Sequence, residues 1–495
     1  MVDLTPYSTA RPFFGPLESW LPPDDAERIA AYQLYESIYK NVPDAFKIIQ
    51  RGNDANPIYV PSAKTIIEAK NRYLAKRWTF AMDPRIGTDA DRAVVSTMLT
   101  NLFRREAVWS KFATQKRFGL IRGDQVWHIV ADETKPAGKR LSLYELDPAS
   151  YFPIEGTDGR ITGCHIVEPM TLDSGKSVIR RQTYRKTDTG GVSYELTWWE
   201  TSGWDDRPTS GQKLKKASGP PDDPAVPLTM LPPAITAIPV YHIKNSREPN
   251  QTFGVSELMG MERIIGAINQ AISDEELTLA LEGLGLYSTT SGPPVDDDGN
   301  ETNWRIGPGW VVEIDQDAVF KRVNGVVSVA PVQEHIQYLE TKMREAAGIP
   351  DIALGSVDVQ TAESGVALAF KMAPILSGHE EKEQELLSVM DHLLYDLTHM
   401  WMPTYEGLGT VEAQAVSIVD DPLPVNRKAT LDEIITMLTN QIITIQYAQQ
   451  IISEKLGYEF PDEMLSDIVT EQKALALARN ADPFASRVEQ ELGNE

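Results

Sequence analysis

The chain has 495 residues, 42% of them hydrophobic and 24% charged, which describes an ordinary globular protein longer than one hydrophobic core usually holds. The formal net charge of −24 argues against a protein that grips DNA over a broad surface, because such a grip requires Lys and Arg side chains that neutralise phosphates. The single cysteine, Cys164, excludes a disulfide framework within the chain and a cysteine-based zinc site.

The first part of the chain predicts an extended arm followed by helices. Residues 1–24 are rich in proline and aromatic side chains, which favours the arm. Helices are expected over 26–39 and 62–75, and one or two more over 89–118. A solvated helix face is the interpretation of three cations in that last stretch, Lys111, Lys116 and Arg117.

From Gly119 the hydrophobic period changes from that of helices to that of strands. Short alternating runs, separated by turn residues such as Asp158-Gly159, predict a meandering antiparallel sheet over 119–245. Residues 205–233 are rich in Pro, Gly, Ser and Lys and are interpreted as a surface loop. Helices followed by such a meander predict the α+β class.

A long helix is expected after the sheet. Ser256 can cap its start, and it runs to about Glu282, a length of roughly 40 Å at 1.5 Å per residue. The chain then becomes polar over 288–301, and two short strand-like runs follow over 309–314 and 318–323. The sequence therefore predicts a small β insert between two long helices.

The second of these helices is expected over 332–347, ending at Gly348-Ile349-Pro350. Its apolar stripe consists of Val332, Ile336, Leu339, Met343 and Ala346. After a loop-like run, helix resumes near Glu363 and continues to about Met402. Two residues inside this third helix, Pro374 and Gly378, predict a kink or a break.

The remainder predicts a strand over 411–419, a boundary at Asp420-Asp421, and helices over 430–456 and 462–479. No apolar run approaches the ~20 residues that a bilayer span requires. The first residues lack the basic and apolar pattern of a secretory signal. We therefore expect a soluble protein that does not associate with a membrane.

Two stretches carry a family resemblance. The run IPVYHIKN from Ile238, followed by FGVSEL from Phe253 and INQAIS from Ile268, is similar to the entry to the stem of a phage portal. The run AAGIPDIALG from Ala346, followed by ESGVAL from Glu363, is similar to a tunnel loop and the start of a tunnel helix. With the order of elements, the chain resembles the portal proteins of tailed bacteriophages, of the type found in phages of actinobacteria and other Gram-positive hosts.

The resemblance implies a portal architecture with a β-rich wing, a two-helix stem, a small β clip, a long tunnel helix and a helical crown. The implied regions are a wing over 1–250, a first stem helix over 251–284, a clip over 285–330, a second stem helix over 331–348, a tunnel loop over 349–363, a tunnel helix with a return to the wing over 364–424, and a crown over 425–495.

The resemblance also implies a function. Portal proteins form a dodecameric ring at one capsid vertex, which is the channel for DNA packaging and ejection. The expected partners are further copies of the chain, double-stranded DNA without sequence preference, the terminase large subunit, a head–tail adaptor protein and the major capsid protein. The expected location is the virion, and the host cytoplasm during assembly. No cofactor is implied.

Two sets of residues are candidates for contact with DNA. The tunnel loop offers small and neutral side chains with one acid, which suits transient contact with a moving duplex; its members are Gly355, Ser356, Val357, Asp358, Val359 and Gln360. An ordinary helix–helix connector is the alternative interpretation of this loop. On the second stem helix, Lys342 and Arg344 can touch phosphates, or can pair with Glu340, Glu345 or a neighbour's acid.

In the expected clip, Trp304 and Trp310 can anchor a partner or a neighbouring subunit, or can pack inside a hairpin. The run Asp296-Asp297-Asp298 can bind a cation. Consecutive carboxylates in a polar loop are usually solvated, so no metal site is expected.

The motifs of common enzyme classes are incomplete in this chain. It has no G-x-x-x-x-G-K-S/T stretch, His379-Glu380-Glu381 lacks the second histidine of a zinc-protease motif, and the residues around Ser256 do not form a G-x-S-x-G elbow. We therefore expect a protein that is not an enzyme. Two alternatives stay open: an uncharacterised soluble hydrolase, which a stable monomer favours, and a non-channel structural scaffold, which a filament or open sheet favours.

Overall fold

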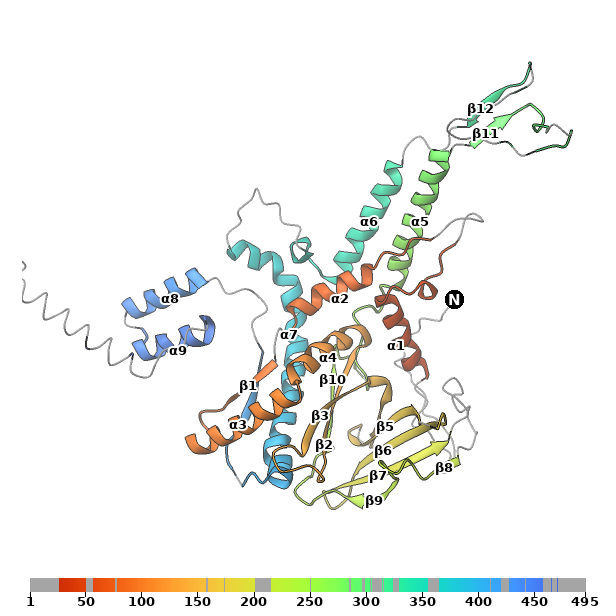
Figure 1. Ribbon diagram of the computed structural model, residues 1–495. Helices are drawn as coiled ribbons and strands as arrows, with labels where there is room; N and C mark the ends of the chain where they lie inside the picture. The colour runs from red at the N-terminus through yellow and green to blue at the C-terminus, as the bar shows by residue number, and fades with distance from the viewer. Residues whose placement is uncertain are drawn as a thin grey trace, which may run out of the picture. The chain divides into compact units, whose positions relative to one another are not determined.

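The computed structural model describes residues 26–49, 57–75, 78–156, 159–172, 174–200, 215–249, 251–284, 286–295, 299–302, 304, 314, 316–323, 329–354, 365–409, 411–419, 427–440, 442–456, 464 and 470. The chain forms two compact units, Met1–Asp420 and Asp421–Glu495. Helices and antiparallel sheets occupy largely separate stretches (Figure 1), so the expected α+β class is confirmed. The division into portal regions stays a prediction.

The first helices of the chain pack beside one another and on the sheet that follows them. They are α1 (Ala26–Tyr39), the 3-10 turn η3 (Pro43–Ala45), α2 (Ser62–Tyr73), α3 (Asp89–Arg105) and α4 (Val108–Arg122). The helical stretch predicted over 89–118 divides at Ala107, whose φ of 50° is left-handed and cannot continue a helix. The hydroxyl of Thr88 accepts the backbone N–H of Asp91 at 3.2 Å and caps α3.

The body contains a three-stranded sheet in the order β10-β2-β3 and a larger sheet in the order β4-β5-β6-β7-β8, with β9 also paired to β7. The strands are β2 (Asp124–Ala131), β3 (Leu141–Leu146), β4 (Tyr151–Glu155), β5 (Ile161–Thr171), β6 (Ser177–Lys186), β7 (Val192–Glu200), β8 (Lys215–Ala217), β9 (Val226–Met230) and β10 (Val240–Lys244), and the 3-10 turn η4 (Pro148–Ser150) precedes β4. Their pairings are antiparallel, as the meander predicts.

The prediction of a surface loop over 205–233 is wrong for β8 and β9, which lie within it. Both strands lie at the edge of the larger sheet, where they pair only with β7. An edge strand tolerates proline and exposed polar side chains, because one of its sides needs no partner. Its composition therefore resembles that of a loop.

The core of the body lies between the helices and the three-stranded sheet. Trp78 on β1 (Trp78–Met82) is completely buried, and its ring centroid lies 5.0 Å from that of Phe103 and 6.3 Å from that of Trp127. Strand β1 pairs with β13 (Ala415–Val419), near the other end of the unit, from Trp78 opposite Val419 to Met82 opposite Ala415. The sequence predicted β13 but gave no indication of its partner.

The two long helices that bracket the insert are α5 (Glu262–Leu284) and α6 (Ala330–Ala347), which run side by side with β11 (Leu286–Thr289) and β12 (Phe320–Val323) paired at their far end (Figure 1). The predicted helix start near Ser256 is wrong. Residues 257–261 form turns, because Gly260 has a φ of 82° that breaks helical geometry. The strand predicted over 309–314 lies outside the described residues, apart from Ile314.

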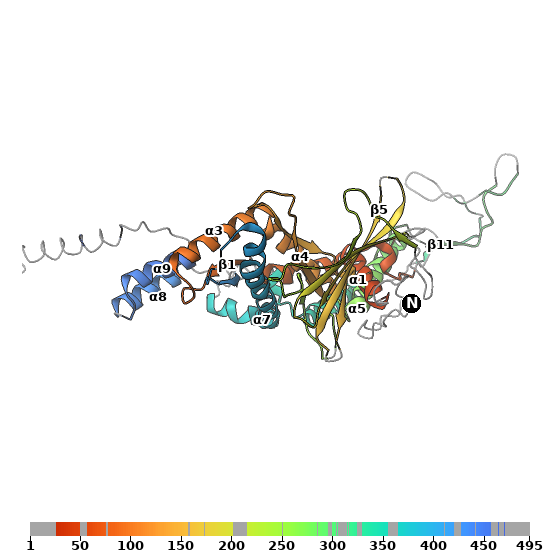
Figure 2. The same cartoon turned by 90° about the horizontal axis from the view of Figure 1, so that it is seen from below.

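The third long helix, α7 (Gly365–Asp396), follows the 3-10 turn η5 (Asp351–Leu354) and continues into the π-helical η6 (Leu397–Glu406). It bends in its N-terminal part (Figure 1), where Pro374 removes a backbone donor. Helix α7 lies beside β10 and beside the β1–β13 pair (Figure 1), and Figure 2 shows α7 next to β1 from below. Among the described residues, no helix has the length and apolar content that a membrane span requires.

The second unit contains α8 (Arg427–Thr439) and α9 (Ile445–Leu456), which pack on each other. The prediction of one helix over 430–456 is wrong. The hydroxyl of Thr444 accepts the backbone N–H of Tyr447 at 3.2 Å, so a new helix begins there. The helix predicted over 462–479 lies outside the described residues, apart from 464 and 470.

Candidate functional site

The paired helices α5 and α6 form the feature on which the expected function depends. They have 23 and 18 residues, roughly 34 Å and 27 Å at 1.5 Å per residue. Near their far end, Gln333 Nε2 on α6 donates to Glu275 Oε1 on α5 at 2.8 Å. The two helices therefore run antiparallel as one rod, which we call the stem pair.

Only one stripe of α6 is buried. It comprises Ile336, Met343 and Ala347, while the predicted stripe member Ala346 is exposed. On the other side, Tyr338 is 57% exposed, its ring stacks on that of His335, and Lys342 Nζ lies 5.8 Å from its centroid. The stem pair thus presents an aromatic and cationic stripe that nothing else among the described residues covers.

The two stem cations that the sequence nominated for DNA contact each have a partner in the same chain. Lys342 Nζ lies 2.7 Å from Glu345 Oε2, and Arg344 Nε lies 3.0 Å from Asp351 Oδ1. Both pairs are partly exposed, and exposed pairs exchange partners at low cost. Lys342 thus pairs with Glu345, one of the alternatives expected for it, whereas the partner of Arg344, Asp351, was not among the expected acids. Contact of either cation with DNA stays a prediction.

The other candidate residues are placed only in part. The tunnel-loop residues 355–360, Trp310 and the run Asp296-Asp297-Asp298 lie outside the described residues. Trp304 is half-buried, and its ring centroid lies 6.2 Å from that of Phe320 on β12. Trp304 thus packs against the β11–β12 pair, while its proposed role in partner binding stays a prediction.

FGVSEL, the second of the three runs that resemble the entry to a portal stem, anchors the stem pair to the body. In FGVSEL, Gly254 lies directly against Gly123, so a Cβ added at Gly254 would lie 2.2 Å from the carbonyl oxygen of Gly123. The backbone N–H of Gly254 donates to Asp124 Oδ1 at 2.7 Å, and the hydroxyl of Ser256 donates to the carbonyl oxygen of Ile121 at 2.5 Å. The motif therefore has a packing role at the base of α5.

Asp124 is the polar centre of this anchor and is completely buried. Besides Gly254, its carboxylate accepts from His242 Nε2 at 2.7 Å and from the Tyr32 hydroxyl at 2.5 Å. Beside it, the guanidinium of Arg28 lies over the Phe253 ring, 4.0 Å from its centroid. A buried charge that loses a partner destabilises the fold, so the carboxylate of Asp124 favours the one arrangement in which Tyr32, His242 and Gly254 all donate to it. The cluster therefore fixes the backbone geometry of FGVSEL.

A second buried cluster connects α2, the segment before α5, and α7. The carboxylate of Glu257 pairs with Lys70 on α2 and with Lys382 on α7, and accepts from Asn245 Nδ2 at 2.7 Å. Burial by itself raises the pKa of the Glu257 carboxyl, but Lys382 and Lys70 outweigh it and lower the pKa to about 2. The stem base and the long helix α7 are thus joined through one carboxylate.

Lys116 lies in the interior next to this cluster, so its interpretation as part of a solvated face is wrong. Its ammonium donates to the backbone carbonyls of Asn71, Leu74 and Ala75 at 3.0, 2.7 and 3.2 Å, which satisfies the C-terminal end of α2. Burial, and then Arg117, lowers the pKa of Lys116 to about 8. Burial and Lys382 lower the pKa of His379, on α7, to about 3, so its imidazole is neutral at pH 7.

INQAIS, the third run of the resemblance, holds Ile49 and the segment 57–60 against α5. Asn269 Oδ1 accepts the N–H of Val60 at 2.9 Å, and Ser273 Oγ accepts the N–H of Ile58 at 2.9 Å. Gln270 both accepts from the N–H of Ile49 at 2.7 Å and donates to its carbonyl at 3.2 Å. These side chains of α5 bind backbone groups of described residues that belong to no strand.

We expect Asn269→Ala to loosen this segment. The N–H of Val60 is half-buried, and leaving such a donor without its acceptor costs about 1 kcal/mol or more, so amide exchange at Val60 should accelerate about fivefold or more. Hydrogen–deuterium exchange measures this directly. Gln333→Ala removes a hydrogen bond at the far end of the stem pair and serves as the control. Equal exchange at Val60 in both variants would contradict the role of Asn269.

Sequence reasoning included some residues of both clusters in the resemblance runs, His242 and Asn245 in IPVYHIKN and Gly254 and Glu257 in FGVSEL, but assigned them no contacts. The partners of Glu257, Lys70 and Lys382, lie far from it in the sequence. Asp124 offered a better signal, because a carboxylate at the start of a strand otherwise made of buried residues requires a partner.

Comparisons with known proteins give matches at the level of structure alone. No protein-family model matches the chain, and no curated protein matches it. A chain of the structure "Neck of native GTA particle computed with C12 symmetry" is 13% identical, with a TM-score of 0.45 over 90% of this chain and 96% of that chain. A chain of "Neck of empty GTA particle computed with C6 symmetry" is 13% identical, with a TM-score of 0.40 over 82% and 94%. Similarity this low carries no functional argument.

Proposed function

We propose that the chain is the ring-forming subunit of a portal, the channel through which DNA enters and leaves a phage-like particle. The stem pair is the observation that carries this proposal. Two long antiparallel helices bracket a small strand pair and are fixed at their base by two buried polar clusters. The same stretches carry the sequence resemblance to portal proteins.

The stem pair leaves apolar side chains exposed, which is unfavourable in a monomer. A helix in a globular protein normally buries a broad apolar face, whereas α6 buries Ile336, Met343 and Ala347 and leaves Tyr338 exposed. On α5, Leu279 is 45% exposed. Copies of the chain that stand side by side around an axis would cover these side chains, and their stems would then form the wall of a channel.

The charge of the chain supports a channel in which DNA moves. A net charge of −24 opposes tight binding of phosphates, so a duplex would pass without being held. Lys342 and Arg344 would make transient contacts by exchanging Glu345 and Asp351 for phosphates, and residues 355–360 would also contact the passing duplex. In this proposal the terminase large subunit, a head–tail adaptor and the major capsid protein are partners in the virion, and the chain has no catalytic role.

The mass of the purified protein tests the proposal. We expect light scattering to give an assembly of many subunits, a dodecamer in the particle, and negative-stain images to show a ring with a central hole. A stable monomer at micromolar concentration would overturn the portal and favour the hydrolase. A filament or open sheet would instead favour the scaffold.

Deletion of residues 355–360 separates assembly from DNA transport. The ring should still form, because the stem pair and the two clusters are intact. Packaging or retention of DNA should fall by about tenfold or more if these residues contact the duplex. Normal packaging by the 355–360 deletion would contradict the tunnel assignment.

A further inference from the structure

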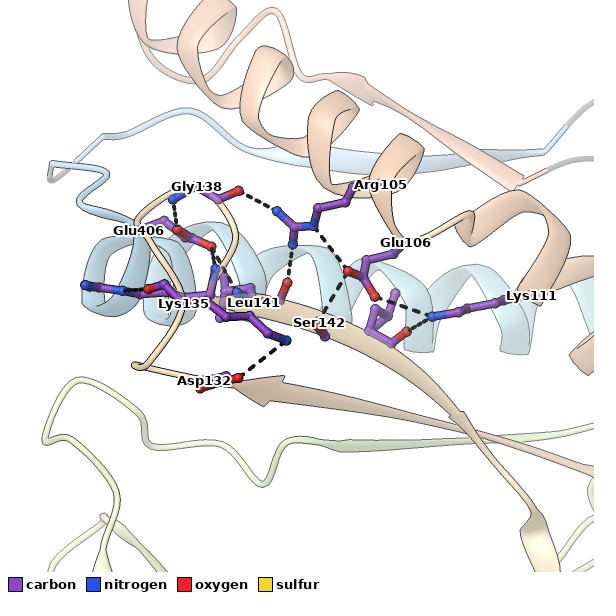
Figure 3. Close-up of polar contacts among 11 residues, drawn as sticks. Arg105, Glu106, Lys111, Asp132, Lys135, Gly138, Leu141, Ser142 and Glu406 are labelled. Carbon is purple, nitrogen blue, oxygen red and sulfur yellow. Dashed lines mark hydrogen bonds and ion pairs between the residues drawn. The ribbon is translucent and has the colours of Figure 1, made fainter. Parts of the chain in front are cut away.

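A second site lies in the body, on elements other than α5 and α6. The loop between β2 and β3 is held from two sides (Figure 3). The Glu406 carboxylate, at the end of η6, accepts the backbone N–H groups of Gly138, of Arg140 at 2.8 Å and of Leu141 at 2.9 Å. From the other side, the Arg105 guanidinium on α3 donates to the carbonyls of Gly138 and Leu141.

These contacts frame a small pocket between α3, the loop and η6. Its volume is about 70 Å³, and its wall includes the apolar side chains of Met98, Leu102, Leu141 and Met402. Sites for cofactors and drug-sized ligands occupy about 300–1,000 Å³, so this pocket is too small for them. It has the size of one apolar side chain, which is how anchor residues dock in protein interfaces.

The residues next to the pocket are mainly cationic, although the chain as a whole is acidic. Asn101 and Arg105 lie on the face of α3 that lines the pocket. Arg104, beside them, and Lys139, beside Gly138 in the loop, are exposed and make no ion pair with any residue in the described part of the chain. A local excess of cations in a chain of net charge −24 favours an acidic partner.

The charged groups in the wall of the pocket, Arg105 and Glu406, already have partners. Glu406 forms part of the wall, and its carboxylate already accepts three backbone donors. A second carboxylate beside Glu406 would meet electrostatic repulsion. The acidic groups of a partner therefore belong at the mouth, and the group that enters the pocket must be apolar.

We propose that this pocket docks an acidic segment of another protein, with one apolar side chain in the pocket and flanking carboxylates against Arg104 and Lys139. The site goes beyond the channel function, because it uses none of the residues assigned to DNA contact. In a portal it would give the body a point of attachment that does not depend on the stem pair.

The test uses the purified full-length protein in its natural assembly state. The probe is a fluorescein-labelled, amidated peptide of sequence Glu-Glu-Leu-Glu-Glu, followed by fluorescence anisotropy at low salt. The comparison peptides are Glu-Glu-Ala-Glu-Glu, which lacks the anchor, and Lys-Lys-Leu-Lys-Lys, which reverses the charge. We expect the first peptide to bind at least about tenfold more tightly than either comparison.

Two variants locate the binding. The double variant Arg104→Glu/Lys139→Glu should weaken binding of the acidic peptide by about tenfold or more. Asn101→Trp, at an exposed position on the rim, should block the pocket without a change in the core. Lys47→Glu with Lys64→Glu makes the same change in net charge at exposed positions elsewhere and should leave binding unchanged.

Three outcomes would overturn the proposal. Equal affinity for the three peptides, or no binding, would exclude an anchored acidic partner. An equal loss of peptide affinity in the Arg104→Glu/Lys139→Glu variant and in the Lys47→Glu/Lys64→Glu control would show that net charge alone causes the binding. Loss of the high-mass assembly in the Arg104→Glu/Lys139→Glu variant would mean that a second copy of the chain occupies the site. The mass of the unmodified protein tests the portal proposal separately, so the two can fail independently.

Discussion

Gly254→Ala is expected to remove most of the stability of the body. The new Cβ would lie 2.2 Å from the carbonyl oxygen of Gly123 and 2.9 Å from the backbone nitrogen of Asn245, and both neighbours are backbone atoms that cannot rotate away. Displacing them breaks the hydrogen bonds to Asp124 and separates the stem base from the body. We expect a loss of about 3–5 kcal/mol in the free energy of unfolding, measured by denaturant unfolding.

Gly266→Ala on α5 is the matched control for this prediction. Among the described residues, no atom outside the local helix lies within 4 Å of the position of its Cβ. Alanine is the better helix former by roughly 0.5–1 kcal/mol, so this variant should be as stable as the original or slightly more so. If the two glycine variants unfold alike, close packing at Gly254 is not what holds the stem base.

Glu257→Gln is expected to have the second large effect. The substitution leaves the ammonium groups of Lys70 and Lys382 buried next to each other without a negative partner. Removing one partner of a buried ion pair costs about 3–5 kcal/mol. Thermal unfolding at pH 7 measures the loss, and Glu276→Gln, at an exposed position on α5, should leave the unfolding temperature nearly unchanged.

The same carboxylate predicts a pH dependence. Its pKa is about 2 in the folded chain and 4.5 ordinarily, so between these values the unfolded chain binds more protons than the folded one. Stability from Glu257 is therefore fully present above pH 4.5 and is lost as the pH falls toward 2, about 3 kcal/mol in total. The stability difference between the original chain and Glu257→Gln should shrink over this window. A difference that stays constant down to pH 2 would contradict the ionised state of Glu257.

The sequence predicted the elements that local chemistry determines. The stripe of α6, its end at Gly348 and the meander of the body follow from side-chain periods and from turn residues, which act over a few positions. The start of α5 was misplaced, because Ser256 has the chemistry of a helix cap but donates to Ile121 in the body. Tertiary contacts decided that boundary.

The residues that hold the stem pair could not be predicted, because their partners are distant in the sequence. Lys116 is the clearest example. On a helical wheel it looks like a solvated cation, whereas three carbonyls at the end of α2 make it an interior residue. Only the folded chain brings such groups together, so the candidate site was predicted as a pair of helices and not as the clusters that orient them.

The pairing of β1 with β13 has a consequence for synthesis at the ribosome. Strand β1 comes early in the first unit, after α1 and α2, and β13 closes the unit, so the body cannot be completed until Val419 has emerged. Contacts between distant segments form slowly, and the nascent chain carries an unpaired strand edge until then. The stem helices are translated before this closure, so the body of each chain closes only after both stem helices have been made.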